Sequence, residues 1–488
     1  MKKKQTDNFI KDYLWPILIS LVAISFVLLG LDLWLIVFLV LLLPLLIAKR
    51  AWICYLIIIL LFFEGYEYSL VFAGARVRPA QLIQVTAIIS ILLSILLNRM
   101  KLKKTPIDFF LLAYILANFI SLVNAPLFSR GAKTLILLVS LALLYYIVVN
   151  FLADKNLFDK AFKLLICMGF LQIIFGIYQV VAGTLNYYLG ANLPIGFKGL
   201  AHVDFISSPW GRPYGTFVEP DWYGVICMFF ALLFISLYIS SAGKAYIGKK
   251  SLFFAIVVSV MGLILSFVRA AWLGFFCGIL YVLFLEKGLS LKASKRKLVI
   301  IGKGIFCASF LFLTVYLVSP PVRSIIERRF AVSGEAGMSF QNVRFAQMRH
   351  SLDLFLKHPI IGNGPGSFAV YGIWGHADSH YDELVKKRTL SIERRYNPSI
   401  ITTVLEDTGV IGTIFFILFF TALTRYNWRY CRVNTYNHYQ KLGNAFFAGI
   451  IGLFVSYIFT HGFWIPFTWV FLGFNICAIK LGMKEKNN

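Results

Sequence analysis

Long apolar runs, repeated about fourteen times along the chain, constrain its fold more than any other feature. Each run has about 15 to 25 residues, and a helix needs about 20 apolar residues to cross the hydrocarbon core of a bilayer. Charged residues make up only 14% of the chain, against about 25% in soluble domains. The sequence therefore predicts an all-α, polytopic membrane protein with about 14 transmembrane helices. The runs lie near 14–31, 33–48, 52–66, 80–98, 107–124, 132–152, 161–182, 222–241, 251–268, 270–286, 298–318, 400–424, 441–461 and 463–482.

The positive charges between the runs predict the orientation. If the N-terminus is cytosolic, every second connecting segment is cytosolic too, and each of these segments carries Lys or Arg. The positive-inside bias applies to such short segments. We therefore expect both termini in the cytosol and the long loops outside it. We interpret the net charge of +25 as an orientation signal and an affinity for anionic membrane lipids, not for nucleic acid.

The spacing of the runs divides the chain into four regions. Residues 1–182 are predicted to form the N-terminal transmembrane helices, and 183–318 to form core transmembrane helices that carry two arginine-bearing turns. Residues 319–399 are predicted to form one large extracytosolic loop domain. Residues 400–488 are predicted to form the C-terminal transmembrane helices.

The large loop contains a helical pattern of its own. Phe345, Met348, Leu352 and Phe355 recur at helical spacing. A His-Pro pair at 358–359 and a glycine-rich turn then stop the pattern. We expect this helix to lie on the membrane surface or to cap the bundle.

Two arginines stand at predicted extracytosolic ends of apolar runs. Arg212 lies in a Gly- and Pro-rich turn before the run at 222–241, and Arg269 follows the run at 251–268. A guanidinium group is always charged and donates two parallel hydrogen bonds, which suits pyrophosphate. The alternative is an interfacial anchor whose side chain reaches the lipid headgroups. We favour a binding role for both arginines, with Tyr214 of the first turn as a further substrate contact.

Candidate bases lie in two places. Glu219 precedes the run at 222–241 and could take a proton from an acceptor hydroxyl group. It could equally be an acidic residue that favours a helix N-terminus, with Asp221 as the cap, and the sequence leaves both readings open. His376 and His380 in the large loop are alternative bases.

The sequence predicts no metal site and no cofactor. The segment from His376 to Glu383 resembles a metal-ligand cluster in composition, but no further distant ligand is evident. Seven cysteines lie singly, without a CxxC pair. No nucleotide-binding motif of the P-loop or Rossmann type occurs.

Four segments together resemble the O-antigen ligase and O-antigen (repeat-unit) polymerase superfamily of membrane glycosyltransferases. RPYGTF at 212–217 and SFVRAAWLG at 266–274 look like its two arginine motifs. HPIIGNGPGSF at 358–368 is similar to its outer-loop glycine turn. LEDTGVIG at 405–412 is similar to the motif that begins its next helix. The resemblance covers roughly residues 200 to 425, with the four segments in the family order.

The resemblance implies a GT-C-like fold and a metal-independent glycosyltransferase in the bacterial cytoplasmic (inner) membrane. Such enzymes move a glycan from an undecaprenyl-pyrophosphate carrier to an acceptor hydroxyl group at the outer face. By similarity, Arg212 and Arg269 would hold the pyrophosphate leaving group. Arg395, in the large loop, would reach the carrier or the sugar. A flippase and a chain-length regulator are the partners that the resemblance implies.

One departure from the family pattern selects among the possible functions. Ligases of this family usually carry a His-Asn pair about eleven residues before the first glycine of the closing motif, and this chain has Pro398-Ser399 there. We therefore favour a repeat-unit polymerase with Glu219 as the base. A ligase would need another base, such as His376 or His380. A lipid-linked oligosaccharide flippase, which is not an enzyme, is the third hypothesis.

Overall fold

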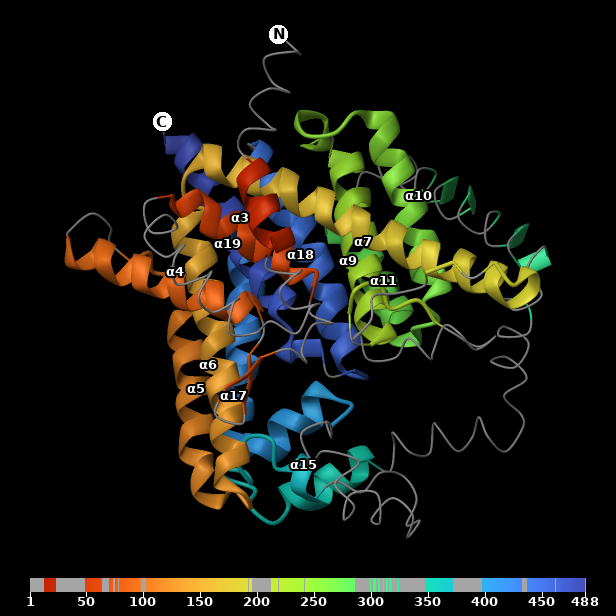
Figure 1. Ribbon diagram of the computed structural model, residues 1–488. Helices are drawn as coiled ribbons and strands as arrows, with labels where there is room; N and C mark the ends of the chain where they lie inside the picture. The colour runs from red at the N-terminus through yellow and green to blue at the C-terminus, as the bar shows by residue number, and fades with distance from the viewer. Residues whose placement is uncertain are drawn as a thin grey trace.

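The apolar runs fold into helices that pack side by side (Figure 1). The computed structural model describes residues 13–22, 49–63, 70–72, 75–77, 79–97, 102–191, 193–194, 212–217, 219–240, 242–285, 347–371, 397–431, 437–460 and 462–487, with isolated positions between 299 and 323. Its elements are α3 (Arg50–Leu61), β1 (Leu70–Phe72), β2 (Ala75–Val77), α4 (Pro79–Leu96), α5 (Asp108–Ser121), η2 (Leu122–Asn124), α6 (Phe128–Phe151), α7 (Lys155–Leu189), α9 (Pro220–Ser240), η3 (Ala242–Ala245), α10 (Lys249–Leu265), α11 (Arg269–Leu280), η4 (Tyr281–Leu285, a π-helix), α15 (Phe368–Tyr371), α17 (Ile400–Cys431), α18 (His438–Tyr457), η6 (Gly462–Trp464) and α19 (Pro466–Asn487).

Helices α3 to α7, α9 to α11 and α17 to α19 coincide with eleven of the fourteen predicted runs, most of them to within a few residues. Five of them, α6, α7, α9, α17 and α19, are long and apolar enough to cross a membrane by length and composition. The total of fourteen spans stays a prediction. The structure adds a short antiparallel hairpin of β1 and β2, which we did not predict, and it extends α7 at both ends beyond the predicted run at 161–182.

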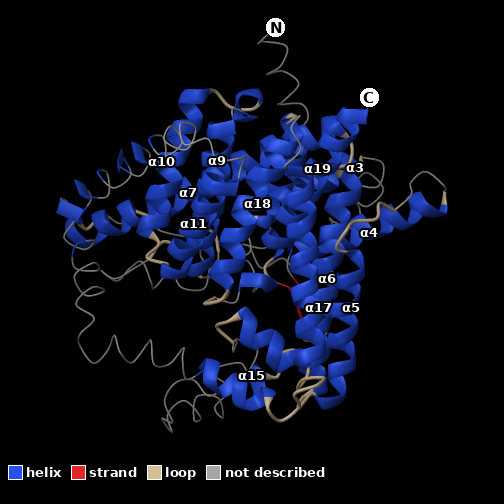
Figure 2. Cartoon of the chain, turned by 180° about the vertical axis from the view of Figure 1, so that it is seen from behind, coloured by secondary structure: helices blue, strands red, loops and turns tan. Residues whose placement is uncertain are grey.

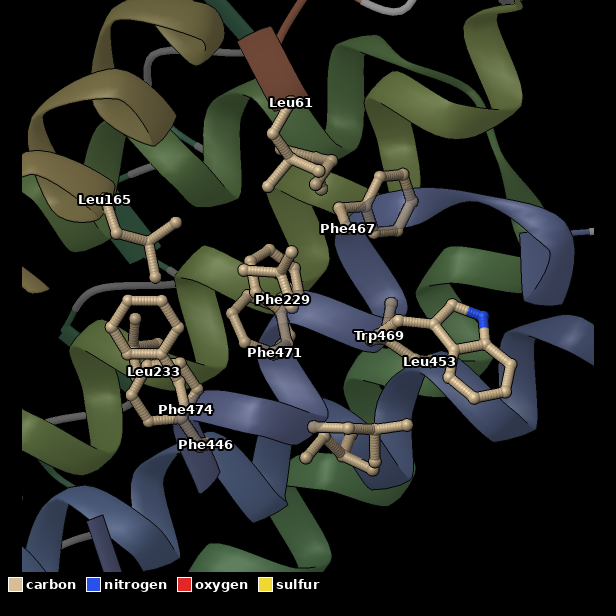
Figure 3. Close-up of a cluster of buried hydrophobic side chains, with 14 of the residues drawn as sticks. Leu61, Leu165, Phe229, Leu233, Phe446, Leu453, Phe467, Trp469, Phe471 and Phe474 are labelled. Atoms are coloured by element: carbon tan, nitrogen blue, oxygen red, sulfur yellow. The ribbon is translucent and has the colours of Figure 1, made fainter. Parts of the chain in front are cut away.

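Helix α9 lies at the centre of the core, together with α18 and α19 (Figure 3). Its side chains from Trp222 to Leu237 are buried on every face, as expected of a helix that is apolar all round. Phe229 of α9 stacks on Phe471 of α19 with ring centroids 3.8 Å apart. This aromatic core fixes the position of α9, whose first turn carries the candidate site.

Glycines let the neighbouring helices approach closely. A Cβ atom on Gly176 of α7 would lie 2.2 Å from the ring of Tyr223 in α9, and one on Gly274 of α11 would lie 2.3 Å from the carbonyl oxygen of Gly452 in α18. Because neither glycine has a side chain, α7 packs directly on the ring of Tyr223 in α9, and α11 packs on the backbone of α18.

The helices define two ends of the bundle. We call the end where α9, α11 and α17 begin the site end. At the opposite end, Lys155 of α7 pairs with Glu485 of α19 at 2.7 Å, and Asp159 accepts hydrogen bonds from Tyr246 (2.6 Å) and Tyr439 (2.9 Å). Helices α5, α6 and α17 form a column that extends toward α15, and α19 ends on the side of the molecule away from α15 (Figures 1 and 2).

The segment at 347–371 corrects one sequence expectation. Residues 347–355 are helical, and the helix ends before His358-Pro359 as predicted. Its buried face, however, is formed by Gln347, Ser351 and Leu354, whereas Leu352 of the predicted apolar stripe is exposed. The buried face differs from the predicted apolar stripe because Ser351 accepts a hydrogen bond from Asn397. A polar side chain can be buried when it is hydrogen-bonded in this way.

Candidate functional site

The first arginine turn, residues 212–217, is fastened to α7 by Gln179. The side-chain oxygen of Gln179 accepts hydrogen bonds from the backbone N–H groups of Tyr214 (3.2 Å) and Gly215 (2.8 Å), and its nitrogen donates to the carbonyl oxygen of Gly215 (2.8 Å). Gly215 has a φ of +62°, a conformation that favours glycine. The turn that carries Arg212 is therefore fixed through its backbone.

A second glutamine of α7 holds the same turn. The hydroxyl group of Thr216 donates to the side-chain oxygen of Gln172 (2.8 Å) and contacts the carbonyl oxygen of Phe62 at the end of α3. Gln172 and Gln179 are seven residues apart, so they lie on one face of the helix. The sequence analysis missed both glutamines. The available signal was two amide side chains at helical spacing inside an apolar run, because polar groups within membrane helices usually face the protein interior.

The second arginine turn, which joins α10 to α11, contains a strained residue. Phe267 has a φ of +54°, which is uncommon for a bulky residue and costs energy that the surroundings must offset. Trp272 donates its indole N–H to the carbonyl oxygen of Leu263 (3.0 Å), and Ser456 of α18 donates to that of Ala270 (3.0 Å). These bonds hold the backbone on both sides of Arg269, whose side chain is exposed.

Both arginine turns pack on the same first turn of α9. A Cβ atom on Gly215 would lie 3.2 Å from the ring of Tyr223, and one on Gly224 would lie 2.6 Å from Val268 and 2.7 Å from Ser266. Adjacent residues of α9 therefore contact the two turns. The two turns, which are far apart in the sequence, therefore lie at the same end of α9.

Arg212 is held in place by a carboxylate. Its Nη1 donates to Oδ1 of Asp221 in the first turn of α9, at 3.1 Å, and the two side chains are only 19% and 14% exposed. The buried Nε–H of Arg212 has no hydrogen-bond partner among the described residues. A guanidinium group has five N–H donors, and one bond to Asp221 leaves others able to bind an anion.

The other predicted site residues are placed as follows. Glu219 immediately precedes α9 and is half-buried, and its carbonyl oxygen accepts from the backbone N–H of Trp222 (3.2 Å). Tyr214 is fully buried, so its ring packs inside the protein, and its role as a substrate contact stays a prediction. His376, His380 and Arg395 lie outside the described residues. In the part of the chain that the structure describes, no three His, Cys, Asp or Glu side chains could hold a metal ion.

A second polar cluster at the site end was not foreseen. Glu406 and Asp407 of α17 are 0% and 2% exposed. The hydroxyl group of Ser367 donates to Oε1 of Glu406 (2.8 Å), and the side-chain amide of Asn397 approaches Oε2 at 3.4 Å. The backbone N–H of Gly366 donates to Oδ1 of Asp407 (3.0 Å). We call Glu406, Asp407, Ser367 and Asn397 the carboxylate cluster.

The backbone of the glycine turn at 362–366 is hydrogen-bonded to the backbone of α17 near its start. The N–H groups of Asn363 and Gly364 donate to the carbonyl oxygens of Glu406 (2.8 Å) and Asp407 (3.0 Å). The side chain of Asn124, after α5, donates to the carbonyl oxygen of Gly362 (2.9 Å). The carboxylate cluster therefore joins two segments that the sequence analysis treated only as separate family resemblances.

The fold and the site define a class of protein: a helical membrane protein with two fixed arginine turns at one end. Residues 254–417 match the family described as O-Antigen ligase, and this match supports the resemblance to the O-antigen ligase and polymerase superfamily. It includes Arg269 and the whole carboxylate cluster, whereas Arg212 and Glu219 lie before it. Members of this family are glycosyltransferase-like enzymes. The search of curated proteins found no match.

The pairing of Arg212 with Asp221 leads to a testable prediction. We expect Asp221→Ala to lower the rate of glycan transfer about tenfold, because misplacing a positioning group is costly for the rate. Asp221→Asn keeps an oxygen that can accept the bond from Arg212, so we expect a much smaller loss. The rate is measured with purified protein in liposomes. Full activity of Asp221→Ala would contradict the orienting role.

Proposed function

We propose that this protein is a polymerase that joins oligosaccharide repeat units carried on undecaprenyl pyrophosphate into a growing surface polysaccharide. The observation that carries the proposal is the convergence of both arginine turns on the first turn of α9. The buried Nε–H of Arg212, which has no hydrogen-bond partner in the part of the chain that the structure describes, supports an anionic ligand at this point. A pyrophosphate is an anion that two guanidinium groups can bind.

In the proposed reaction, a hydroxyl group of the acceptor glycan attacks the anomeric carbon of the carrier-linked glycan. The bond between that carbon and the pyrophosphate oxygen breaks, and undecaprenyl pyrophosphate leaves. Arg212 and Arg269 stabilise the negative charge that develops on the leaving group, and Glu219 takes the proton of the attacking hydroxyl group. Arg395 contacts the carrier or the sugar, and no metal ion takes part.

The start of α17 favours a polymerase over a ligase. Pro398 and Ser399, where ligases of the family usually carry the His-Asn pair, are both buried. Ser399 donates its backbone N–H to the side chain of Asn397 (3.1 Å), and its carbonyl oxygen accepts from Thr403 (2.6 Å). This position is therefore occupied by groups that begin a helix, and neither of them is a base.

We propose that the site end faces the extracytosolic side of the bacterial cytoplasmic membrane. The Lys- and Arg-rich segments of the sequence support this orientation. A flippase would then deliver the lipid-linked repeat units from the cytosolic face, and a chain-length regulator would act on the product.

Cells that lack the protein test this proposal. A gel of surface glycan and an analysis of carrier lipids should show single repeat units in place of long chains. Long glycan that stays on the carrier at the outer face would instead identify a ligase. Carrier-linked glycan trapped on the cytosolic face would identify a flippase, and either result would overturn the proposal.

Glu219→Gln tests the proposed base. The substitution keeps the size of the side chain and removes its ability to take a proton, so we expect a loss of rate of about 10²-fold or more with the protein still inserted in the membrane. If Glu219 only favours the N-terminus of α9, the rate will change little. Steady-state transfer rates as a function of pH distinguish the two, because loss of a base also removes the acidic limb of the profile.

A further inference from the structure

One buried carboxylate bonds to two segments that are far apart in the sequence. Glu406 accepts from Ser367, which is 39 residues before it, at 2.8 Å, and from Asn397 at 3.4 Å. The side chain of Asn397 in turn donates to Ser351 (2.6 Å). Ser367 and Asn397 lie on either side of residues 372–396 in the sequence. The side chain of Glu406 therefore connects the segment before that stretch with the segment after it.

The side chain of Glu406 is not needed to hold the glycine turn itself. The backbone N–H groups of Asn363 and Gly364 bond to backbone oxygens of α17, and Val410 donates its N–H to the carbonyl oxygen of Pro359 (2.8 Å). Gly366 donates to the neighbouring Asp407 (3.0 Å). Loss of the Glu406 carboxylate therefore leaves the turn attached to α17 and removes the connection between Ser367 and Asn397.

Burying this carboxylate without an ion pair among the described residues is unfavourable for folding. A charged group costs free energy when it leaves water, and hydrogen bonds offset that cost only in part. Glu406 has a fully buried side chain with Ser367 and Asn397 as hydrogen-bond partners. An apolar residue of similar size would be more favourable to bury, but it could not bond to both segments. The carboxylate at this position therefore indicates that its two hydrogen bonds have a role other than stabilising the fold.

We propose that Glu406 is a positioning residue for the transfer reaction, because its carboxylate fixes Ser367 and Asn397 relative to α17. This inference rests on the proposed function. Glu406 does not touch the substrate, since its side chain is fully buried. Its loss should lower kcat and leave KM nearly unchanged, because Arg212 and Arg269, which are proposed to bind the carrier, lie outside α17.

The test uses the full-length protein in liposomes with lipid-linked repeat units. Glu406→Leu keeps a side chain of similar size and has no atom that can accept a hydrogen bond, so the bonds from Ser367 and Asn397 are both lost. We expect kcat to fall at least tenfold and KM to change less than threefold. The matched control is Thr403→Val, which removes a bond to Ser399 (2.6 Å) within the same helical turn and should keep the wild-type rate.

Glu406→Gln separates positioning from folding. Its side-chain oxygen can accept from Asn397 and its NH2 group can donate to the hydroxyl oxygen of Ser367, so both contacts can be kept with one of them reversed. We expect Glu406→Gln to recover at least half of the wild-type kcat, whereas Glu406→Leu stays slow at the same abundance in the membrane.

Three results would overturn this inference: wild-type kcat for Glu406→Leu, a kcat for Glu406→Gln as low as that of Glu406→Leu, or an equal loss of activity in Thr403→Val. Failure of the proposed function is recognised separately. If the wild-type protein itself forms no polymer from the repeat units, the polymerase proposal fails, irrespective of how the Glu406 variants behave.

Discussion

Arg269→Ala is expected to lower the rate of polymer synthesis by about 10²–10³-fold, and Arg212→Ala to do the same. Each substitution removes a positive group that would stabilise the negative charge developing on the leaving pyrophosphate. Both variants should remain in the membrane at wild-type abundance, since Arg269 is exposed and the turn of Arg212 is held through Gln172 and Gln179. Polymer formed in liposomes is measured by gel electrophoresis.

Two comparisons make the arginine prediction specific. Lys at either position keeps the charge and loses the planar pair of donors, so Arg269→Lys and Arg212→Lys should recover little activity. Arg425→Ala removes an exposed arginine near the opposite end of α17 and should stay within twofold of the wild type. A fully active alanine variant at position 212 or 269 would rule out binding of the pyrophosphate by that residue.

Gly409→Ala is expected to cause a large loss of stability. Gly409 has φ of 62° and ψ of −161° and interrupts the helix, a conformation that is nearly restricted to glycine. An added Cβ atom would lie 2.5 Å from the carbonyl oxygen of Ile360. Strain and overpacking should together cost on the order of 3 kcal/mol and separate the glycine turn from α17.

Gly190→Ala is the matched control for this prediction. Gly190 ends α7 with a φ of 60°, which is close to that of Gly409, but no atom lies within 4 Å of the added Cβ position. Its cost should be only about 1 kcal/mol. Thermal unfolding of the detergent-solubilised proteins compares the two variants. Equal unfolding midpoints for Gly409→Ala and the wild type would show that the break in α17 does not depend on glycine.

The sequence could predict where the helices lie and which end carries the arginines. Apolar length locates most helices because a bilayer fixes the length of a crossing helix, and α9 and α10 lie within three residues of the expected runs. Gly and Pro around Arg212, and the break between two runs at Arg269, indicated turns. The sequence placed both arginine turns on the same predicted side of the membrane, and only the structure shows that both pack on α9.

The partners of the polar side chains could not be predicted in the same way. Glu406 and Ser367 are 39 residues apart, and no periodic pattern connects residues at such a separation. Asp221 could be read as a helix cap from its position, and only the fold places it against Arg212. The break of α17 at Gly409 could not be predicted either, because the predicted run at 400–424 continues past this glycine.

Purified wild-type protein in liposomes, supplied with undecaprenyl-pyrophosphate-linked repeat units as the only glycan, tests the central claim most directly. We predict a ladder of products that differ by one repeat unit, together with release of undecaprenyl pyrophosphate in proportion to the bonds formed. Repeat units that all remain single on the carrier, with no pyrophosphate lipid released, would contradict the assignment of this protein as a polymerase.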